Sequence, residues 1–188
     1  MYPFLETDLT IDAYKYAYKR HGAKKQLRKG SRKPYIVHPV EVATILSKVT
    51  TNEIVVTAGL LHDVVEDTFH DRAFGLAVIE KRYGREVASL VEMVTDVSLP
   101  SDGSRAERKA KDREHLSLAD PDGKTIKLAD CISNSANILE LKFDGFAYVY
   151  LPEMLQLVDV LQEGDQTLHA KFVSQLNRAT LQLNAKSS

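Results

Sequence analysis

The sequence contains little cysteine and no long apolar run. Its one cysteine, Cys131, excludes a disulfide within the chain of 188 residues and is typical of a reducing compartment. No stretch approaches the roughly 18 apolar residues that a membrane-spanning helix requires. The first ten residues include Glu6 and Asp8 and do not resemble a signal peptide. We therefore expect a single cytoplasmic domain over residues 1–188, with its core at about 9–180 and no membrane association.

Net charge is also nearly absent. The chain has 25 Lys and Arg against 26 Asp and Glu, a formal net charge of −1. This balance argues against a protein that coats nucleic acid or a membrane through bulk charge. It hides an uneven distribution, however, because residues 15–33 carry nine basic and no acidic side chains, and the rest of the chain therefore carries −10. Such a run is either a solvated helix face or part of a binding surface.

Strand-type alternation of apolar and polar residues is missing, and apolar residues recur at helical spacing instead. Glycines at 84, 103, 145 and 164 fall between the periodic segments and mark breaks. The fold class should therefore be all-α. The expected helices cover about 9–25, 39–50, 53–66, 71–82, 85–96, 104–117, 123–140, 147–163 and 165–183.

The expected helix over 53–66 combines an apolar body with ionisable residues at its end. Its first half is apolar on nearly every side, which indicates a central, buried helix. Yet His62, Asp63, Glu66 and Asp67 follow directly. Burying such groups without partners is costly, so a compensating charge is required. Because residues four apart share a helix face, Glu66 should stand one turn from His62, and Asp67 one turn from Asp63.

Two further polar residues lie in apolar surroundings. His38 precedes a helix expected to begin at Pro39, and Asp130 lies within the expected helix 123–140. Either residue alone would be unremarkable as a hydrogen-bonded core residue. With His62 and Asp63, however, they form a set of two imidazoles and two carboxylates, which suits a divalent manganese, iron, cobalt or zinc ion. The remaining histidines are interpreted as surface or structural residues: His21, His70, His115 and His169.

Three ordered motifs resemble the HD superfamily of metal-dependent phosphohydrolases, and more closely the hydrolase domain of RelA/SpoT homologues. They are RKGSRKPYIVHP at 28–39, GLLHDVVEDT at 59–68 and KLADCISN at 127–134. The resemblance covers about residues 9–180. It implies a single-domain helical bundle of the HD superfamily and a stand-alone small alarmone hydrolase, because no synthetase region follows.

The resemblance also implies an activity and its residues. Such enzymes remove the 3′-pyrophosphate of (p)ppGpp, giving GDP or GTP and pyrophosphate. One Mn²⁺ is held by the residues that match His38, His62, Asp63 and Asp130, and the pair that matches Glu66 and Asp67 positions and activates the attacking water. Substrate contacts are implied for Arg28 against the purine, Asn134 on the sugar, and Lys29, Arg105 and Tyr150 on phosphates or sugar. On this interpretation Arg28 and Lys29 form the wall of a nucleotide pocket, while Lys15 to Lys25 form a solvated helix face.

The sequence departs from the family pattern after Asp130. Cys131 and Ser133 stand where Lys or Arg and His or Tyr are common, and Ser135-Ala136 replaces Met-Arg or Leu-Arg. These positions should lie beside the nucleotide pocket, so the base preference is open. Adenine alarmones, (p)ppApp, and NADPH are both candidate substrates.

Alternative functions stay open as well. An HD-type 5′-nucleotidase would release inorganic phosphate rather than pyrophosphate, and an NADPH phosphatase is a further possibility. The chain could instead be a nucleotide-sensing or antitoxin-like binding protein, although the complete ionisable set argues against an inactive scaffold. Nucleic-acid binding is not expected, because Tyr14, Tyr16 and Tyr18 are two apart on a helix and cannot share one stacking face. The expected partner is a small nucleotide substrate with a 3′-pyrophosphate.

Overall fold

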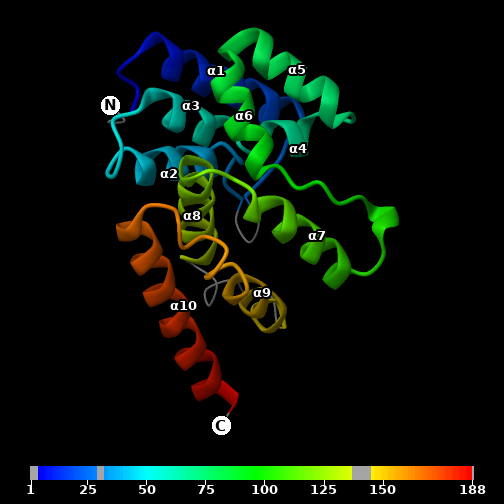
Figure 1. The fold of residues 1–188 in the computed structure, drawn as a ribbon, viewed down its shortest axis with the longest axis vertical. Coiled ribbons are helices and arrows are strands. Elements are labelled where there is room, and N and C mark those ends of the chain that lie inside the picture. Colours follow the sequence, from blue (N-terminus) through cyan, green and yellow to red (C-terminus); the bar gives the residue numbers. More distant parts are fainter. Residues whose placement is uncertain (1–3, 29–31, 137–144, 188) are drawn as a thin grey trace.

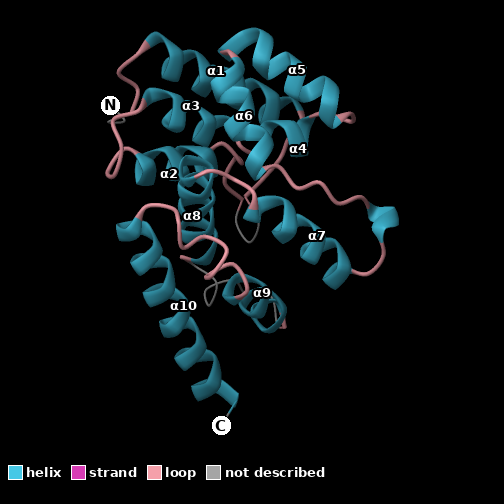
Figure 2. Cartoon of the chain, in the orientation of Figure 1, coloured by secondary structure: helices cyan, strands magenta, loops and turns pink. Residues whose placement is uncertain are grey.

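The computed structural model describes residues 4–28, 32–136 and 145–187. Within these ranges the chain forms ten α-helices and one short 3₁₀ helix, and its only strand-like feature is an isolated antiparallel bridge between Leu27 and Pro34. The all-α prediction is therefore confirmed (Figure 2). The elements are α1 (Asp8–Ala23), α2 (Val37–Leu46), α3 (Glu53–Leu61), α4 (Val64–Thr68), α5 (Arg72–Tyr83), α6 (Arg85–Val94), η1 (Pro100–Asp102), α7 (Arg105–Ser117), α8 (Pro121–Ser135), α9 (Phe146–Leu155) and α10 (Gln166–Ser187).

Helices α3 and α8 form the centre of the bundle. Helix α3 packs against α1, α2, α6 and α8, and α8 packs in turn against α2, α6 and α10. Figure 1 shows α1 to α6 gathered at one end of the molecule, with α8 leading from them toward α7, α9 and α10. Every residue from Val55 to Leu61 is buried, as the apolar pattern of this segment predicts. None of the helices in the described ranges combines the length and apolar composition that a bilayer crossing requires.

A glycine allows α3 to approach α2 closely. A Cβ atom at Gly59 would lie 2.4 Å from Cδ1 of Leu46 and 3.5 Å from Cγ1 of Val42, both on α2. Leu46 and Val42 are fully buried, so neither side chain has open solvent into which it could withdraw. Glycine at this position therefore fits the narrow spacing between α2 and α3, the helices that carry His38 and lead into His62.

The expected helix 53–66 is divided in two. Helix α3 ends at Leu61, and α4 begins at Val64 after a turn at His62 and Asp63. The imidazole Nδ1 of His62 lies 2.8 Å from the carbonyl oxygen of Gly59, the acceptor that the amide of residue 63 would use in a continuous helix. Helical bonding resumes when the amide of Asp67 donates to the carbonyl of Asp63 at 2.9 Å. The prediction of one uninterrupted helix was wrong.

Other helix boundaries also differ from the prediction. Helix α2 begins at Val37, so His38 lies in its first turn rather than before it. Helix α8 begins at Pro121, where the side chain of Asp120 accepts a hydrogen bond from the amide of Gly123 at 2.8 Å. It ends at Ser135, and residues 137–140 of the expected helix 123–140 lie outside the described ranges. The expected helix 147–163 ends at residue 155 and continues as turns.

Candidate active site

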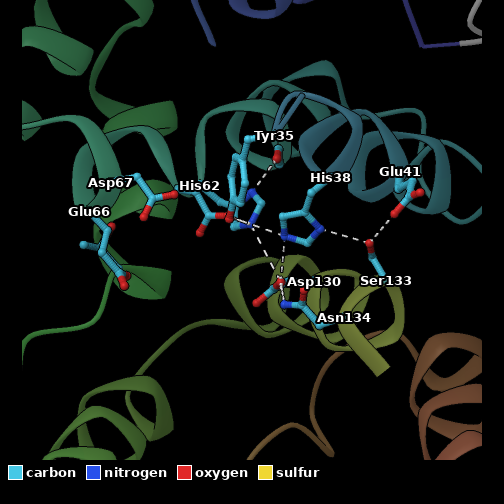
Figure 3. A network of polar contacts seen from close by, with 12 residues as sticks. Tyr35, His38, Glu41, His62, Glu66, Asp67, Asp130, Ser133 and Asn134 are labelled. Atoms are coloured by element: carbon cyan, nitrogen blue, oxygen red, sulfur yellow. Dashed lines mark hydrogen bonds and ion pairs between the residues drawn. The ribbon is translucent and has the colours of Figure 1, made fainter. Parts of the chain in front are cut away.

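Three of the four predicted metal ligands converge from helices that are distant in sequence. His38 lies on α2, His62 directly follows α3, and Asp130 lies on α8. All three side chains are buried, and one ligand atom from each lies within 4.8 Å of the others. Figure 3 shows the two imidazoles facing each other with the Asp130 carboxylate beside them. This cluster could hold a divalent metal ion.

The hydrogen bonds of the two imidazoles direct one nitrogen of each toward the cluster. The carbonyl of Gly59 can only accept a hydrogen bond, so Nδ1 of His62 carries a proton. Nδ1 of His38 lies 2.9 Å from Oγ of Ser133. Both Nε2 atoms are buried and have no partner of hydrogen-bond geometry among the described residues. Buried polar atoms are rarely left unpaired, and a metal ion would satisfy both, so the residues fit such an ion.

Asp63 joins this cluster from the turn between α3 and α4. Its Oδ2 atom lies 3.0 Å from Nε2 of His62 and 3.5 Å from Nε2 of His38. Asp130 contributes Oδ1 at 3.1 Å from Nε2 of His38 and 3.8 Å from Nε2 of His62. The hydroxyl of Tyr35 donates to Oδ2 of Asp63 at 2.5 Å, which fixes that carboxylate. Carboxylate oxygens and imidazole lone pairs repel one another at these distances unless a positive charge lies between them.

The pKa values of Asp130, Asp63 and His62 are shifted by the charges that these residues and their neighbours place on one another. Burial raises the pKa of Asp130, but Lys127 and the two imidazoles outweigh burial and hold it well below its usual range. For Asp63 the charges of His62 and His38 likewise overcome burial and lower the pKa. Burial lowers the pKa of His62, yet Asp63 and Asp130 raise it to about 9. The carboxylates thus stay ionised and attract a cation, either a proton or a metal.

Glu66 and Asp67 extend from α4 on one side of the imidazoles (Figure 3). The amide of Asp96 donates to Oε2 of Glu66 at 3.3 Å, and Nε2 of Gln26 donates to Oδ2 of Asp67 at 2.7 Å. Enclosure by protein atoms, with the negative charges of Asp96 and Asp63, raises the pKa of Glu66 to about 7, although its side chain still reaches solvent. Burial and Asp63 raise the pKa of Asp67 to about 6. Glu66 and Asp67, which can take up and release protons near neutral pH, thus lie beside Asp63 and Asp130, which stay ionised.

A cavity of about 280 Å³ opens beside the cluster. Asp63, Glu66 and Asp130 contribute to its wall. The same wall carries four cationic side chains, Arg105, Lys109, Arg113 and Lys127. An anionic ligand that enters this cavity would therefore meet positive charge and the candidate metal ligands together.

The predicted substrate residues are distributed differently from the metal ligands. Arg105, Asn134 and Tyr150 line the cavity. Arg105 makes a bidentate ion pair with Glu153, at 2.6 and 2.8 Å. Arg28 donates to Oδ1 of Asn134 at 2.6 Å, so these two predicted contacts lie side by side. Lys29 lies outside the described residues.

Several residues that support the site carry no recognisable sequence signal. His21, which is expected at the surface or in a structural role, is buried, with Nδ1 2.8 Å from Oε1 of Gln26. Gln26 in turn binds Asp67. Arg20 belongs to the run that was expected to be solvated, yet its guanidinium donates to the hydroxyl and carbonyl of Thr68 at 3.0 and 2.8 Å. No motif marks these contacts, because most of them join residues more than 40 positions apart.

The positions that depart from the family pattern take different roles. Cys131 lines the cavity, and burial together with Asp130 raises the pKa of its thiol to about 12. Ser133 instead contacts the imidazole of His38 and the carboxylate of Glu41. Among the described residues, the hydroxyl of Ser135 bonds within its own helix and donates to the carbonyl of Cys131 at 2.7 Å.

Comparisons with known proteins show the family to which this chain belongs. The HD domain family pattern matches residues 13–136. Guanosine-3′,5′-bis(diphosphate) 3′-pyrophosphohydrolase MESH1 of Xenopus tropicalis is 36% identical over 160 residues, covering 83% of this chain and 84% of that protein. The MESH1 protein of Danio rerio is 34% identical over 157 residues, covering 81% and 82%. A probable guanosine-3′,5′-bis(diphosphate) 3′-pyrophosphohydrolase of Synechocystis is 40% identical over 129 residues, and the chain spans only 16% of its length.

A solved structure shows the same fold. It is described as a metazoan ortholog of SpoT that hydrolyzes ppGpp and plays a role in starvation responses. The two structures align with a TM-score of 0.78 at 29% sequence identity, covering 95% of this chain and 97% of the other. The chain therefore belongs to the HD domain family and is a phosphohydrolase of the guanosine-3′,5′-bis(diphosphate) 3′-pyrophosphohydrolase-like type.

Proposed function

We propose that this enzyme hydrolyses the 3′-pyrophosphate of a purine alarmone, (p)ppGpp and/or (p)ppApp, in the cytoplasm. The products would be pyrophosphate and GDP or GTP, or the corresponding adenine nucleotides. The observation that carries the proposal is the buried cluster of His38, His62 and Asp130 beside a cavity whose wall combines Glu66 with four cations. The relatives named for ppGpp hydrolysis support the same substrate class.

We assign His38, His62, Asp63 and Asp130 as ligands of one divalent ion, with Mn²⁺ as the expected metal. Two imidazole nitrogens and two carboxylates suit a borderline transition ion better than calcium, which prefers oxygen ligands, or structural zinc, which often uses thiolates. When bound, such an ion lowers the pKa of a water ligand and polarises a phosphoryl oxygen. The Nε2 atoms of both histidines support this assignment, because they are buried, face carboxylate oxygens and have no partner of hydrogen-bond geometry among the described residues.

Glu66 and Asp67 would orient the attacking water and accept its proton. A general base works best when its pKa lies near the working pH, and the pKa of Glu66 is raised to about 7. Water attacks the phosphorus attached to the ribose 3′ oxygen, and the bond between that phosphorus and the 3′ oxygen breaks. The 3′ oxygen takes up a proton and becomes a hydroxyl group of the nucleotide, the carboxylate base releases the proton that it accepted, and pyrophosphate leaves.

The cationic wall would offset the charge of the polyphosphate. Lys109, Arg113 and Lys127 face the same cavity as Asp130, and fixed cations stabilise the negative charge that develops during phosphoryl transfer. Arg105 would exchange its carboxylate partner Glu153 for a phosphate, because a guanidinium binds either group through two parallel hydrogen bonds. Arg28, Lys29, Asn134 and Tyr150 complete the proposed nucleotide site.

A product assay tests this function. The protein is freed of metal with a chelator, supplied with Mn²⁺, and incubated separately with ppGpp, ppApp, NADPH and nucleoside monophosphates, and the products are separated by chromatography. We expect pyrophosphate and a nucleotide with a free 3′-hydroxyl from one or both alarmones. Phosphate release from a nucleoside monophosphate would instead identify a 5′-nucleotidase, and release from NADPH would identify an NADPH phosphatase. If neither alarmone is cleaved, the proposal is wrong.

A further inference from the structure

The hydroxyl of Ser133 lies at the meeting point of three polar side chains. Its Oγ atom is 2.9 Å from Nδ1 of His38 and 2.7 Å from Oε2 of Glu41, to which it donates. A guanidinium nitrogen of Arg28 donates to the same oxygen at 3.3 Å. Ser133 and His38 are both buried, and Figure 3 shows Ser133 and Glu41 on the side of His38 that faces away from His62.

These contacts determine where the protons lie. A serine hydroxyl has one proton to donate and two lone pairs that accept. The guanidinium of Arg28 can only donate, so it occupies one lone pair, and the carboxylate of Glu41 receives the hydroxyl proton. The second lone pair then faces Nδ1 of His38, which must carry a proton. Nε2 of His38 is left with its lone pair directed toward the metal cluster.

The two histidine ligands are thus oriented by different kinds of acceptor. His62 relies on the backbone carbonyl of Gly59, which is fixed by the helix itself. His38 relies on a side chain, Ser133, which a substitution can remove. Glu41 is the outermost member of this arrangement and is 48% exposed, so replacing it leaves no buried cavity.

We propose that Ser133, supported by Glu41, is the positioning residue of the metal ligand His38. It selects the tautomer and the ring orientation in which Nε2 faces the divalent ion. The inference rests on the proposed metal site. Replacing a residue that hydrogen-bonds the non-coordinating nitrogen of a histidine ligand typically weakens metal binding by about 10- to 100-fold.

The test measures Mn²⁺ binding directly, by isothermal titration calorimetry on metal-free protein. Ser133→Ala should weaken Mn²⁺ binding by about 10- to 100-fold. The matched control is Ser135→Ala, which removes another buried hydroxyl from α8, one whose partner among the described residues is the carbonyl of Cys131. This control should bind Mn²⁺ as the wild type does. Unchanged affinity in a folded Ser133→Ala protein would overturn the proposal.

Glu41 provides a second comparison that keeps the core intact if Ser133→Ala fails to fold. Glu41→Ala removes the acceptor of the hydroxyl proton and should weaken Mn²⁺ binding, whereas Glu41→Gln keeps an acceptor oxygen and should lie closer to the wild type. Equal affinity of both variants and the wild type would contradict the proposed role. A wild-type chain that binds no Mn²⁺ would overturn the proposal as well. A wild type that binds Mn²⁺ but cleaves no alarmone would refute only the proposed substrate.

Discussion

Gln26 holds the carboxylate of Asp67 through a hydrogen bond of 2.7 Å from its amide nitrogen to Oδ2. The amide oxygen of Gln26 is itself 2.8 Å from Nδ1 of the buried His21, so the amide cannot turn freely. One oxygen of Asp67 is thereby engaged by the protein, and the carboxylate is held in one orientation. The contact joins the segment after α1 to the short helix α4, which carries Glu66 as well.

Replacement of Gln26 therefore tests the orientation of Asp67. Gln26→Leu keeps a similar volume but removes the hydrogen bond, so we expect kcat to fall by up to about 10²-fold, the effect of a misplaced reacting group. KM should change little, because Gln26 does not line the cavity. Steady-state kinetics measure both constants, and Gln156→Leu, at an exposed position, serves as the control. A wild-type kcat in Gln26→Leu would show that this hydrogen bond has no catalytic effect.

Glu66 should control the pH dependence of the reaction. Its pKa is raised to about 7 by enclosure, by Asp96 and by Asp63, with Asp67 adding to the effect and Lys127 opposing it. A base must be deprotonated to act, so kcat should rise as the pH increases through about 7 and then level off. Glu66→Gln should lose about 10²- to 10⁴-fold in kcat, the usual contribution of a positioned acid–base group, while Mn²⁺ binding persists.

Asp96→Asn offers a sharper test of the same assignment. Removing the negative charge of Asp96 should lower the pKa of Glu66 and move the rising limb of the pH profile to lower pH. Asp102→Asn is the control, because this carboxylate pairs with Lys111 and is not part of the cavity wall. If the rising limb of the pH profile of kcat lies at the same pH in Asp96→Asn as in the wild type, a group other than Glu66 causes it.

Arg28 should act mainly on substrate binding. It donates to Asn134 at 2.6 Å and to the carbonyl of Ser133 at 3.1 Å, both on the helix α8 that carries Asp130. We expect Arg28→Ala to raise KM for the alarmone more than it lowers kcat, because it removes binding that substrate and transition state share. Kinetics across a range of alarmone concentrations separate the two constants. A loss confined to kcat would place Arg28 in the chemical step instead.

Replacement of Gly164 tests how tightly the turn before α10 packs against α8. A Cβ atom there would lie 2.8 Å from Cδ1 of Leu128 and 3.1 Å from backbone atoms of Lys124 and Thr125. Gly164→Ala should therefore lower the free energy of unfolding by about 1–3 kcal/mol, the usual cost of overpacking. Gly22→Ala, where a Cβ meets nothing within 4 Å on α1, should be neutral or stabilise by up to about 1 kcal/mol. Denaturant unfolding measures both, and equal stabilities would contradict the packing described for Gly164.

Much of the fold and the cluster could be predicted from local pattern. Apolar periodicity indicates most of the helices, and the occurrence of polar residues within apolar segments singles out His38, His62 and Asp130, which the structure brings together. The division at His62 could not be predicted, because it depends on an imidazole that competes for a backbone carbonyl. Contacts between segments that are distant in sequence could not be predicted either. The ion pair of Arg105 with Glu153 joins residues 48 positions apart, and no pattern in the sequence around either residue indicates it.

The Mn²⁺ dependence of pyrophosphate release from ppGpp and ppApp, measured in the wild type and in Asp130→Ala, tests whether this cluster is the catalytic metal site. After chelator treatment, the wild type should regain activity toward at least one alarmone as Mn²⁺ is added. Asp130→Ala should neither bind the ion nor release pyrophosphate at any Mn²⁺ concentration. Turnover by Asp130→Ala that depends on Mn²⁺ as in the wild type would contradict the assignment of this cluster as the metal site.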